Sequence, residues 1–506
     1  MTASIRRVAM TLFVLFAALF VNLNYLQVIR ADELAEDNRN TRRLIAEYQV
    51  RRGSIIAGDG QTELARVEDT GGRLRFQRIY DQGELFAHVT GFHSFIFGRS
   101  QVEQTYNDVL SGGASEAITR NLTDLLAGRE RAGDDIVTTV RPAVQAAARD
   151  ALGGQRGAVI ALHPQTGAIL AMWSNPAYDP NLLASHEAPA VREAAEALQA
   201  DETEPLRNRA MAVRYNPGST FKLVTAAAAL AAGVTPDSSF PDPARQPLPL
   251  TTATIGNFGG GPCAGGGSIT LRQALVVSCN TTFAQLGLQV EADGLVDQAE
   301  RFGLNADFDL GLPTVPSVLP RDGLDPPATA QSAIGQRDVQ VTPLQMAMIT
   351  AAIGNNGTLM TPRIAERVED FATGATVREF PRSAFVPPGQ PDAQAMRPEH
   401  AAALLDMMVG VVAQGTGRGA AIPGVSVAGK TGTAQAEGAP TVWFTGLAPA
   451  EDPQVAVAVV VEDGGAVGVG ATGGAVAAPV ARAVMQAALG EEPTVPGTPQ
   501  ASEPEG

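Results

Sequence analysis

The feature that most constrains this chain is an uninterrupted apolar stretch, residues 8–28, close to the N-terminus. As an α-helix, its 21 residues extend about 31 Å, which matches the hydrocarbon core of a bilayer. Arg6 and Arg7 precede the stretch, and the first acidic residue is Asp32. Cytoplasmic flanks of membrane helices are enriched in arginine and lysine. The pattern therefore predicts a transmembrane anchor, with residues 1–7 in the cytoplasm and the rest of the chain outside the plasma membrane.

A cleaved signal peptide is the alternative to an uncleaved anchor. No small-x-small cleavage site follows the apolar stretch, whereas Asn22, Asn24 and Tyr25 are typical of the interfacial end of a membrane helix. We therefore expect the segment to remain in the mature protein as a single-pass anchor.

The rest of the chain divides by composition into two predicted domains and a tail. Residues 29–150 are rich in arginine and acids and predict a smaller domain, with a helix in DLLAGRERAG (124–133). Residues 151–490 begin with GAVIALHPQTGAILAMWSNP, which predicts a β-hairpin, and near their end VSVAGKTGTAQ, TVWFTGLAP and PQVAVAVVVEDG predict three strands before a helix. This indicates an α+β fold, an antiparallel sheet flanked by helices. Residues 491–506, rich in proline and glutamate, predict a disordered tail.

Composition restricts the chemistry that the chain can perform. A net charge of −16 argues against nucleic-acid partners, and two cysteines with five histidines exclude a zinc-finger spacing or an HExxH site. We predict neither a metal nor a cofactor. Of 37 basic residues only Lys222 and Lys430 are lysines. Arginine replaces lysine at most exposed positions but not where an amine must lose its proton, so these two lysines are either chance survivors or functional groups.

Ser219 and Lys222 form the first candidate site. They open a predicted helix that follows a Pro-Gly pair and ends at Gly233, and they lie one turn apart on the same face. A helix-capping serine and a solvated lysine are the alternative, but residues 223–232 are apolar on nearly every side and predict a buried helix. Burial and the positive end of the helix dipole both lower the pKa of an amine. A neutral lysine beside a serine is a general base beside a nucleophile.

Two further motifs follow, Ser278-Cys279-Asn280 at the end of a predicted helix and Lys430-Thr431-Gly432-Thr433 on a predicted strand. In this order, with spacings of 59 and 152 residues, the three motifs resemble the SxxK, SxN and KTG motifs of the penicillin-binding proteins. The resemblance extends to RRGSIIAGDG, AIGQRDVQVTPLQMAMITAAIGNNG and GTGRGA, and so covers almost the whole chain. An anchor, a pedestal and no glycosyltransferase domain make the chain similar to class B members of the short actinobacterial A type. It departs from them at Ala57 and Gly58, where an acid and a base are usual, and at Arg337, where a small residue is usual.

The resemblance implies a penicillin-binding/β-lactamase-like transpeptidase domain and a role for each motif residue. Ser219 would attack the D-Ala-D-Ala amide of a stem peptide and hold it as an acyl-enzyme, with Lys222 as the base. Ser278 would relay the proton to the leaving D-alanine, and Asn280 would bind the peptide and orient Lys222.

The KTG residues would bind the substrate. Lys430, with Thr431 and Thr433, would hold its carboxylate, and the N–H groups of Ser219 and Thr433 would form the oxyanion hole. Gly432, like Gly429, would let the substrate backbone approach the strand. The implied partners are peptidoglycan stem peptides, β-lactams and a separate membrane glycosyltransferase.

Two questions stay open at the sequence. Cys263 and Cys279 either form a disulfide or remain a free thiol and a buried one. A D,D-transpeptidase is the leading function, with a D,D-carboxypeptidase and a non-catalytic β-lactam-binding scaffold or sensor as alternatives. Residues 204–208 resemble the deacylating loop of β-lactamases. They precede the nucleophile instead of lying between the SxN and KTG motifs, so we do not expect β-lactamase activity.

Overall fold

The computed structural model of the protein describes residues 2–25, 45–114, 131–308, 310–435 and 438–490. The predicted tail at 491–506 and most of the predicted helix at 124–133 lie outside the described residues.

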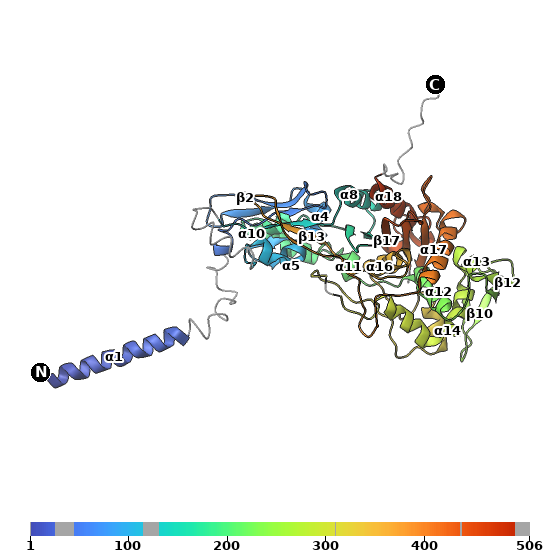
Figure 1. Ribbon diagram of the computed structural model, residues 1–506, viewed down its shortest axis with the longest axis horizontal. Helices are drawn as coiled ribbons and strands as arrows, with labels where there is room; N and C mark the ends of the chain where they lie inside the picture. The colour runs from blue at the N-terminus through green and yellow to red at the C-terminus, as the bar shows by residue number, and fades with distance from the viewer. Residues whose placement is uncertain (1, 26–44, 115–130, 309, 436–437, 491–506) are drawn as a thin grey trace, which may run out of the picture.

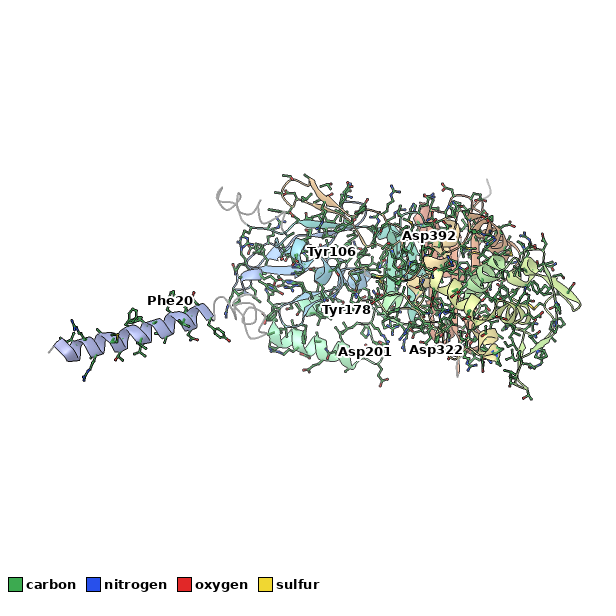
Figure 2. The ribbon with its side chains drawn as sticks, turned by 60° about the horizontal axis from the view of Figure 1, so that its bottom comes forward. Phe20, Tyr106, Tyr178, Asp201, Asp322 and Asp392 are labelled. Atoms are coloured by element: carbon green, nitrogen blue, oxygen red, sulfur yellow. A yellow bond between two sulfur atoms is a disulfide. The ribbon has the colours of Figure 1, made fainter. Side chains whose placement is uncertain are left out.

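The apolar stretch near the N-terminus forms one helix, α1 (Thr2–Asn24). Its window Ile5–Asn24 has a mean hydropathy of 1.7 and is 0% buried. Phe20 projects from it and is 68% exposed (Figure 2). Its length and composition therefore fit the predicted membrane anchor.

A five-stranded antiparallel sheet forms the centre of the larger part of the molecule. The strand order is β15-β16-β17-β7-β8. The predicted hairpin is confirmed, because β7 and β8 pair antiparallel, and so are the three predicted strands, because β15, β16 and β17 pair in sequence. The five strands are β7 (Gly157–Leu162), β8 (Ile169–Asn175), β15 (Ala428–Ala434), β16 (Thr441–Ala448) and β17 (Val455–Val461).

Helices cover both faces of this sheet. Helices α8 (Pro142–Leu152) and α18 (Ala477–Leu489) pack together on one face, and α16 (Pro343–Gly354) packs on the other (Figure 1). All seven residues of β17 are buried. A strand covered on both faces requires a continuous apolar run rather than alternation, which is why its sequence reads VAVAVVV.

A mainly helical lobe lies beside the sheet (Figure 1). Its central helix packs against two others within the described chain, so nine of its ten residues are buried. The lobe contains η2 (Gly218–Phe221), α12 (Lys222–Ala231), α13 (Leu271–Val276), α14 (Asn280–Arg301), α15 (Pro326–Ser332) and α17 (Pro398–Ala413).

The N-terminal part is built on a second sheet, of order β14-β13-β6-β1-β2-β3. Two of its strands come from residues 365–379, far beyond the predicted boundary at residue 150. In the register of β13 with β6, Val368 lies opposite Ile136, and both side chains are buried. The strands are β1 (Ile55–Ile56), β2 (Glu63–Asp69), β3 (Phe76–Ile79), β6 (Asp135–Thr138), β13 (Ala365–Glu369) and β14 (Thr376–Glu379).

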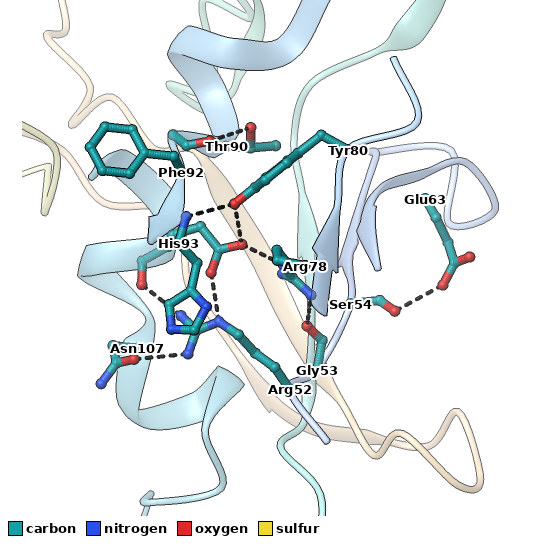
Figure 3. A network of polar contacts seen from close by, with 12 residues as sticks. Arg52, Gly53, Ser54, Glu63, Arg78, Tyr80, Thr90, Phe92, His93 and Asn107 are labelled. Carbon is teal, nitrogen blue, oxygen red and sulfur yellow. Dashed lines mark hydrogen bonds and ion pairs between the residues drawn. The ribbon is translucent and has the colours of Figure 1, made fainter. Parts of the chain in front are cut away.

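A buried ionic network lies within this N-terminal part (Figure 3). The carboxylate of Glu103 accepts hydrogen bonds from Arg52 Nε (2.6 Å) and Arg78 Nε (2.5 Å), and Tyr80 donates to the same group (3.1 Å). Burial alone would raise the pKa of Glu103, but the two arginines outweigh it and lower the pKa to about 2. Removal of one partner would leave an uncompensated buried charge. Ala57 is fully buried in the core.

The remaining helices and strands complete the described chain. They are α4 (Gly83–Thr90), β4 (His93–Ser94), β5 (Gly98–Arg99), α5 (Gln101–Thr105), α6 (Asn107–Leu110), α9 (Asn181–Ala184), α10 (Ala188–Ala200), α11 (Arg209–Ala212), β9 (Ser239–Pro241), β10 (Arg245–Pro247), β11 (Thr254–Gly256), β12 (Ser268–Thr270), η3 (Arg418–Ala420), η4 (Glu462–Gly464) and η5 (Gly468–Gly470).

Candidate active site

Ser219 and Lys222 lie at the start of the buried helix of the lobe. The first turn is not α-helical as predicted but the 3₁₀ turn η2, and α12 begins at Lys222. Side chains three residues apart are aligned in a 3₁₀ helix, so this turn keeps Ser219 and Lys222 on one face. Lys222 is fully buried and Ser219 is half-buried. Within the described chain the Ser219 hydroxyl has no hydrogen-bond partner, which leaves its oxygen available to a substrate.

Ser278 lies in the turn between α13 and α14, and Asn280 begins α14; both contact Lys222. The Nζ of Lys222 donates to the Ser278 carbonyl (2.8 Å) and to Asn280 Oδ1 (2.7 Å), and lies 3.3 Å from Ser278 Oγ. The predicted helix that was to carry the SxN motif ends earlier, at Val276. Ser278 has a φ of 61°, a left-handed conformation that interrupts the helix and directs the motif toward the lysine.

Lys430 reaches the same hydroxyl from strand β15. Its Nζ lies 2.8 Å from Ser278 Oγ and 2.9 Å from the Thr431 carbonyl, and its side chain is fully buried. The Thr431 hydroxyl shares a hydrogen bond with that of Thr416 (2.7 Å). The structure thus brings the three predicted motifs together, with two amines directed at one serine hydroxyl.

The two glycines of the strand are packed too closely against the protein to carry a side chain. A Cβ on Gly432 would lie 2.7 Å from the Pro217 carbonyl oxygen, and a Cβ on Gly429 would lie 2.4 Å from the Phe444 ring. Both missing side chains therefore make room for neighbouring parts of the protein itself. The absence of a Cβ at Gly432 allows β15 to pack directly against η2, which places Thr433 beside the nucleophile turn.

The two lysines differ in how strongly their environment favours the neutral amine. Burial lowers the pKa of Lys222 well below its usual value, and the charge of Lys430 lowers it further. Burial alone lowers the pKa of Lys430 to about 7. A neutral Lys222 can accept a proton from a hydroxyl, while a partly protonated Lys430 can bind an anion.

A model of the penicillin-binding protein transpeptidase domain matches residues 157–486, which is more than half of the chain. This chain belongs to the penicillin-binding protein transpeptidase family. A second family model, the penicillin-binding protein A dimerisation domain, matches residues 52–136.

Named relatives of this transpeptidase-family chain come from mycobacteria. It is 43% identical over 507 residues to a peptidoglycan D,D-transpeptidase PbpA of Mycolicibacterium smegmatis, and 42% identical over 512 residues to that of Mycobacterium tuberculosis. Each match covers 97% of this chain and 100% of the relative.

Solved structures of M. tuberculosis penicillin-binding protein A are similar throughout. A ceftriaxone acyl-enzyme complex has a TM-score of 0.82 at 41% identity and covers 88% of this chain and 100% of the other. A penicillin G acyl-enzyme complex has a TM-score of 0.80 at 40% identity and covers 87% of this chain and 100% of the other.

The structure joins the two cysteines of this transpeptidase-family chain in a disulfide. The Cα atoms of Cys263 and Cys279 are 5.8 Å apart. Asp242 lies beside the pair, but its carboxylate accepts from the backbone N–H groups of Cys263 (2.8 Å) and Ala264 (2.6 Å). The bond leaves neither sulfur of this group free to bind a metal.

The sequence did not indicate the residues that hold Asn216, which lies just before the turn that carries Ser219. Trp443 Nε1 donates to the Asn216 carbonyl (3.1 Å), and Asn216 Nδ2 donates to the carbonyls of Val339 (2.9 Å) and Arg337 (3.0 Å). The family-unusual Arg337 contributes this backbone carbonyl, and its own φ is 64°. Neither periodicity nor motif spacing marks such residues, because their partners are backbone atoms distant in sequence.

Proposed function

We propose that this chain is a serine D,D-transpeptidase that cross-links peptidoglycan and is acylated by β-lactams. One observation carries the proposal: two buried lysine amines converge on the Ser278 hydroxyl, and one of them lies a single 3₁₀ turn from Ser219. Two lines of similarity support it. Relatives 43% and 42% identical bear the name peptidoglycan D,D-transpeptidase, and a similar protein forms an acyl-enzyme with penicillin G.

Acylation begins when Ser219 Oγ attacks the carbonyl carbon of the penultimate D-alanine. Neutral Lys222 takes the hydroxyl proton, because its burial and the nearby positive charge disfavour the ammonium. The N–H groups of Ser219 and Thr433 stabilise the oxyanion. Ser278 then donates its proton to the leaving nitrogen and regains one from Lys222. The C–N bond breaks, D-alanine leaves, and the stem peptide remains as an ester on Ser219.

Deacylation completes the cross-link. The amine of a second stem peptide attacks the ester carbonyl and passes a proton to neutral Lys222. The ester C–O bond breaks, and the Lys222 ammonium gives that proton to Ser219 Oγ, which restores the hydroxyl. Before acylation, Lys430 holds the terminal carboxylate of the donor together with the hydroxyls of Thr431 and Thr433, and this carboxylate leaves with D-alanine. A carboxylate there stabilises the ammonium form of Lys430, so substrate binding raises the pKa of that lysine.

The chain organisation follows the same proposal. We assign residues 29–150 to a non-catalytic pedestal, supplemented by β13 and β14, and residues 151–490 to the transpeptidase domain. Residues 1–7 lie in the cytoplasm, and the catalytic domain lies on the outer side of the plasma membrane. Glycan strands come from a separate membrane glycosyltransferase.

The test is D-alanine release from a stem pentapeptide by the purified chain, with and without an acceptor D-amino acid. We expect a cross-linked or exchanged product, and none with Ser219→Ala. Release of D-alanine to water alone would instead indicate a carboxypeptidase. In cells lacking the native allele, Ser219→Ala should fail to restore growth, whereas a scaffold or sensor would still complement.

A further inference from the structure

The SxN turn is held in a strained conformation by a neighbouring segment. Ser278, at the head of the turn, has a φ of 61° although it is not glycine. Such a conformation persists only where the surrounding structure fixes it. The position of the Ser278 hydroxyl between the two lysines therefore depends on what restrains residues 278–281.

Three consecutive residues after Ser278 each bond to the segment 256–263. Cys279 forms the disulfide with Cys263, Asn280 Nδ2 donates to the Gly256 carbonyl (3.0 Å), and the Thr281 N–H donates to Asn257 Oδ1 (3.0 Å). The segment thus contacts the SxN turn at every residue from 279 to 281.

The contact to Gly256 decides which way the Asn280 amide faces. A carbonyl can only accept, so the NH₂ group must face Gly256 and the amide oxygen is left for the Lys222 amine (2.7 Å). The Gly256 carbonyl is itself placed by the next residue. Asn257 Nδ2 donates to the carbonyls of Gly261 (3.1 Å) and Pro243 (3.3 Å), while its oxygen accepts from helix α14.

We propose that Asn257 is a positioning residue for acylation: it fixes the segment 256–263 against the first turn of α14, so that the Asn280 amide oxygen faces Lys222. The inference rests on the proposed acylation of Ser219. Asn257 does not touch the reacting atoms, and it acts through Gly256, Thr281 and Asn280. It lies outside the SxxK, SxN and KTG motifs of this chain.

The consequence for Lys222 has a definite direction. The ammonium form of Lys222 donates to Asn280 Oδ1, and an amide that turns away removes this acceptor, which lowers the pKa of Lys222 further. Around Lys222, strand β15 contributes the charged Lys430, the SxN turn contributes Ser278 and Asn280, and α14 contributes the Phe283 ring, 5.4 Å from Nζ. Acylation requires the neutral amine. When the Asn280 amide turns away, the acylation rate should therefore begin to rise at a lower pH, while the maximum acylation rate falls.

The experiment measures the second-order rate of acylation by benzylpenicillin across pH for Asn257→Ala, Asn257→Asp and the matched control Asn181→Ala. Asn181 also bonds backbone atoms through its amide, the N–H and carbonyl of Tyr80 (both 2.9 Å), but where α9 contacts the N-terminal part rather than at the SxN turn. We expect Asn257→Ala to lose at least tenfold in rate and to shift the acid limb down by roughly half a pH unit. Asn257→Asp keeps the acceptor for Thr281 but loses the amide donor to the Gly261 and Pro243 carbonyls, so it should recover only part of the rate, and Asn181→Ala should match the wild type.

Acylation by Asn257→Ala at the wild-type rate would overturn the inference, and so would a loss with an unchanged pH profile, which a merely structural role predicts. If Asn257→Ala does not fold, Asn257→Ser, with a shorter acceptor, should show a smaller loss and the same direction of shift. An unmodified Ser219 in the wild-type chain would contradict the proposed function instead, so the two failures are distinguishable.

Discussion

At the scale of single residues, Lys222 and Lys430 have the same type of side chain and are both buried, but they contact different groups. Lys222 contacts the serine and the asparagine of the SxN motif and begins the helix that follows Ser219. Lys430 contacts Ser278 and the backbone of its own strand. The first geometry suits a base and the second suits a fixed positive charge.

Substitution by arginine separates these two roles. Arginine stays protonated at neutral pH, so Lys222→Arg removes the base while keeping the charge, and we expect the acylation rate to fall at least about a hundredfold in a folded protein. Lys430→Arg is the matched control and should lose less, because arginine still pairs with a carboxylate. Acylation rates of the purified variants, with circular dichroism as the check on folding, decide the matter. A Lys222→Arg rate close to wild type would make Lys222 a structural cation.

The pH dependence of acylation should show the charge of Lys430. Burial lowers its pKa to about 7, so in the free protein this lysine loses its proton as the pH rises through neutrality. A β-lactam that carries a carboxylate then binds less well, and the second-order rate should fall on the alkaline side of about pH 7. The falling limb should be absent in Lys430→Arg. A wild-type rate that keeps rising to alkaline pH would show that the charge on Lys430 is not needed.

At the scale of elements, the sequence predicted structure where neighbouring residues determine it. The buried strands β7, β8 and β17 are continuous apolar runs, and their turns are local, so the hairpin and the strand triplet were predictable. The pairing of β13 with β6 was not predictable, because more than 200 residues separate Ile136 from Val368 and neither short strand carries a pattern that identifies its partner.

Within the site, the motif residues were predictable but their backbone was not. The left-handed φ of Ser278 and the 3₁₀ turn at Ser219 arise from contacts with other elements, which the local pattern of a helix does not contain. Asn257 likewise bonds backbone atoms of three separate segments, and no spacing in the sequence marks it.

The Cys263–Cys279 disulfide should contribute measurably to stability. It closes a loop with a sequence separation of 16 residues, for which the chain-entropy model gives about 3 kcal/mol. We expect Cys263→Ser to lower the free energy of unfolding by about this amount in a denaturant titration. A reducing agent should lower the stability of the wild type similarly and leave the variant unchanged. Equal stability of wild type and variant under oxidising conditions would mean that the bond is not formed in solution.

At the scale of the whole molecule, the anchor helix and the transpeptidase fold are structurally separate parts. Helix α1 has no buried residue in its apolar window, whereas the rest of the described chain has a core that spans both sheets. The chain cannot be divided cleanly at residue 150, because β13 and β14 complete the N-terminal sheet.

Membrane attachment should therefore depend on the first residues alone. Mass spectrometry of the membrane fraction should find residues 8–28 still attached, and a chain that begins at residue 45 should leave the membrane fraction while keeping its acylation rate. A mature N-terminus near residue 30 would show that the segment is a cleaved signal peptide.

The central claim is that Ser219 is the nucleophile, and covalent labelling tests it most directly. Benzylpenicillin should add its own mass to the intact protein, and peptide mapping should place the adduct on Ser219, because its hydroxyl bonds to none of the described residues and the Lys222 amine lies on the same face of the turn. Ser219→Ala should remain unlabelled under the same conditions. An adduct on any other residue, or equal labelling of Ser219→Ala, would contradict the account.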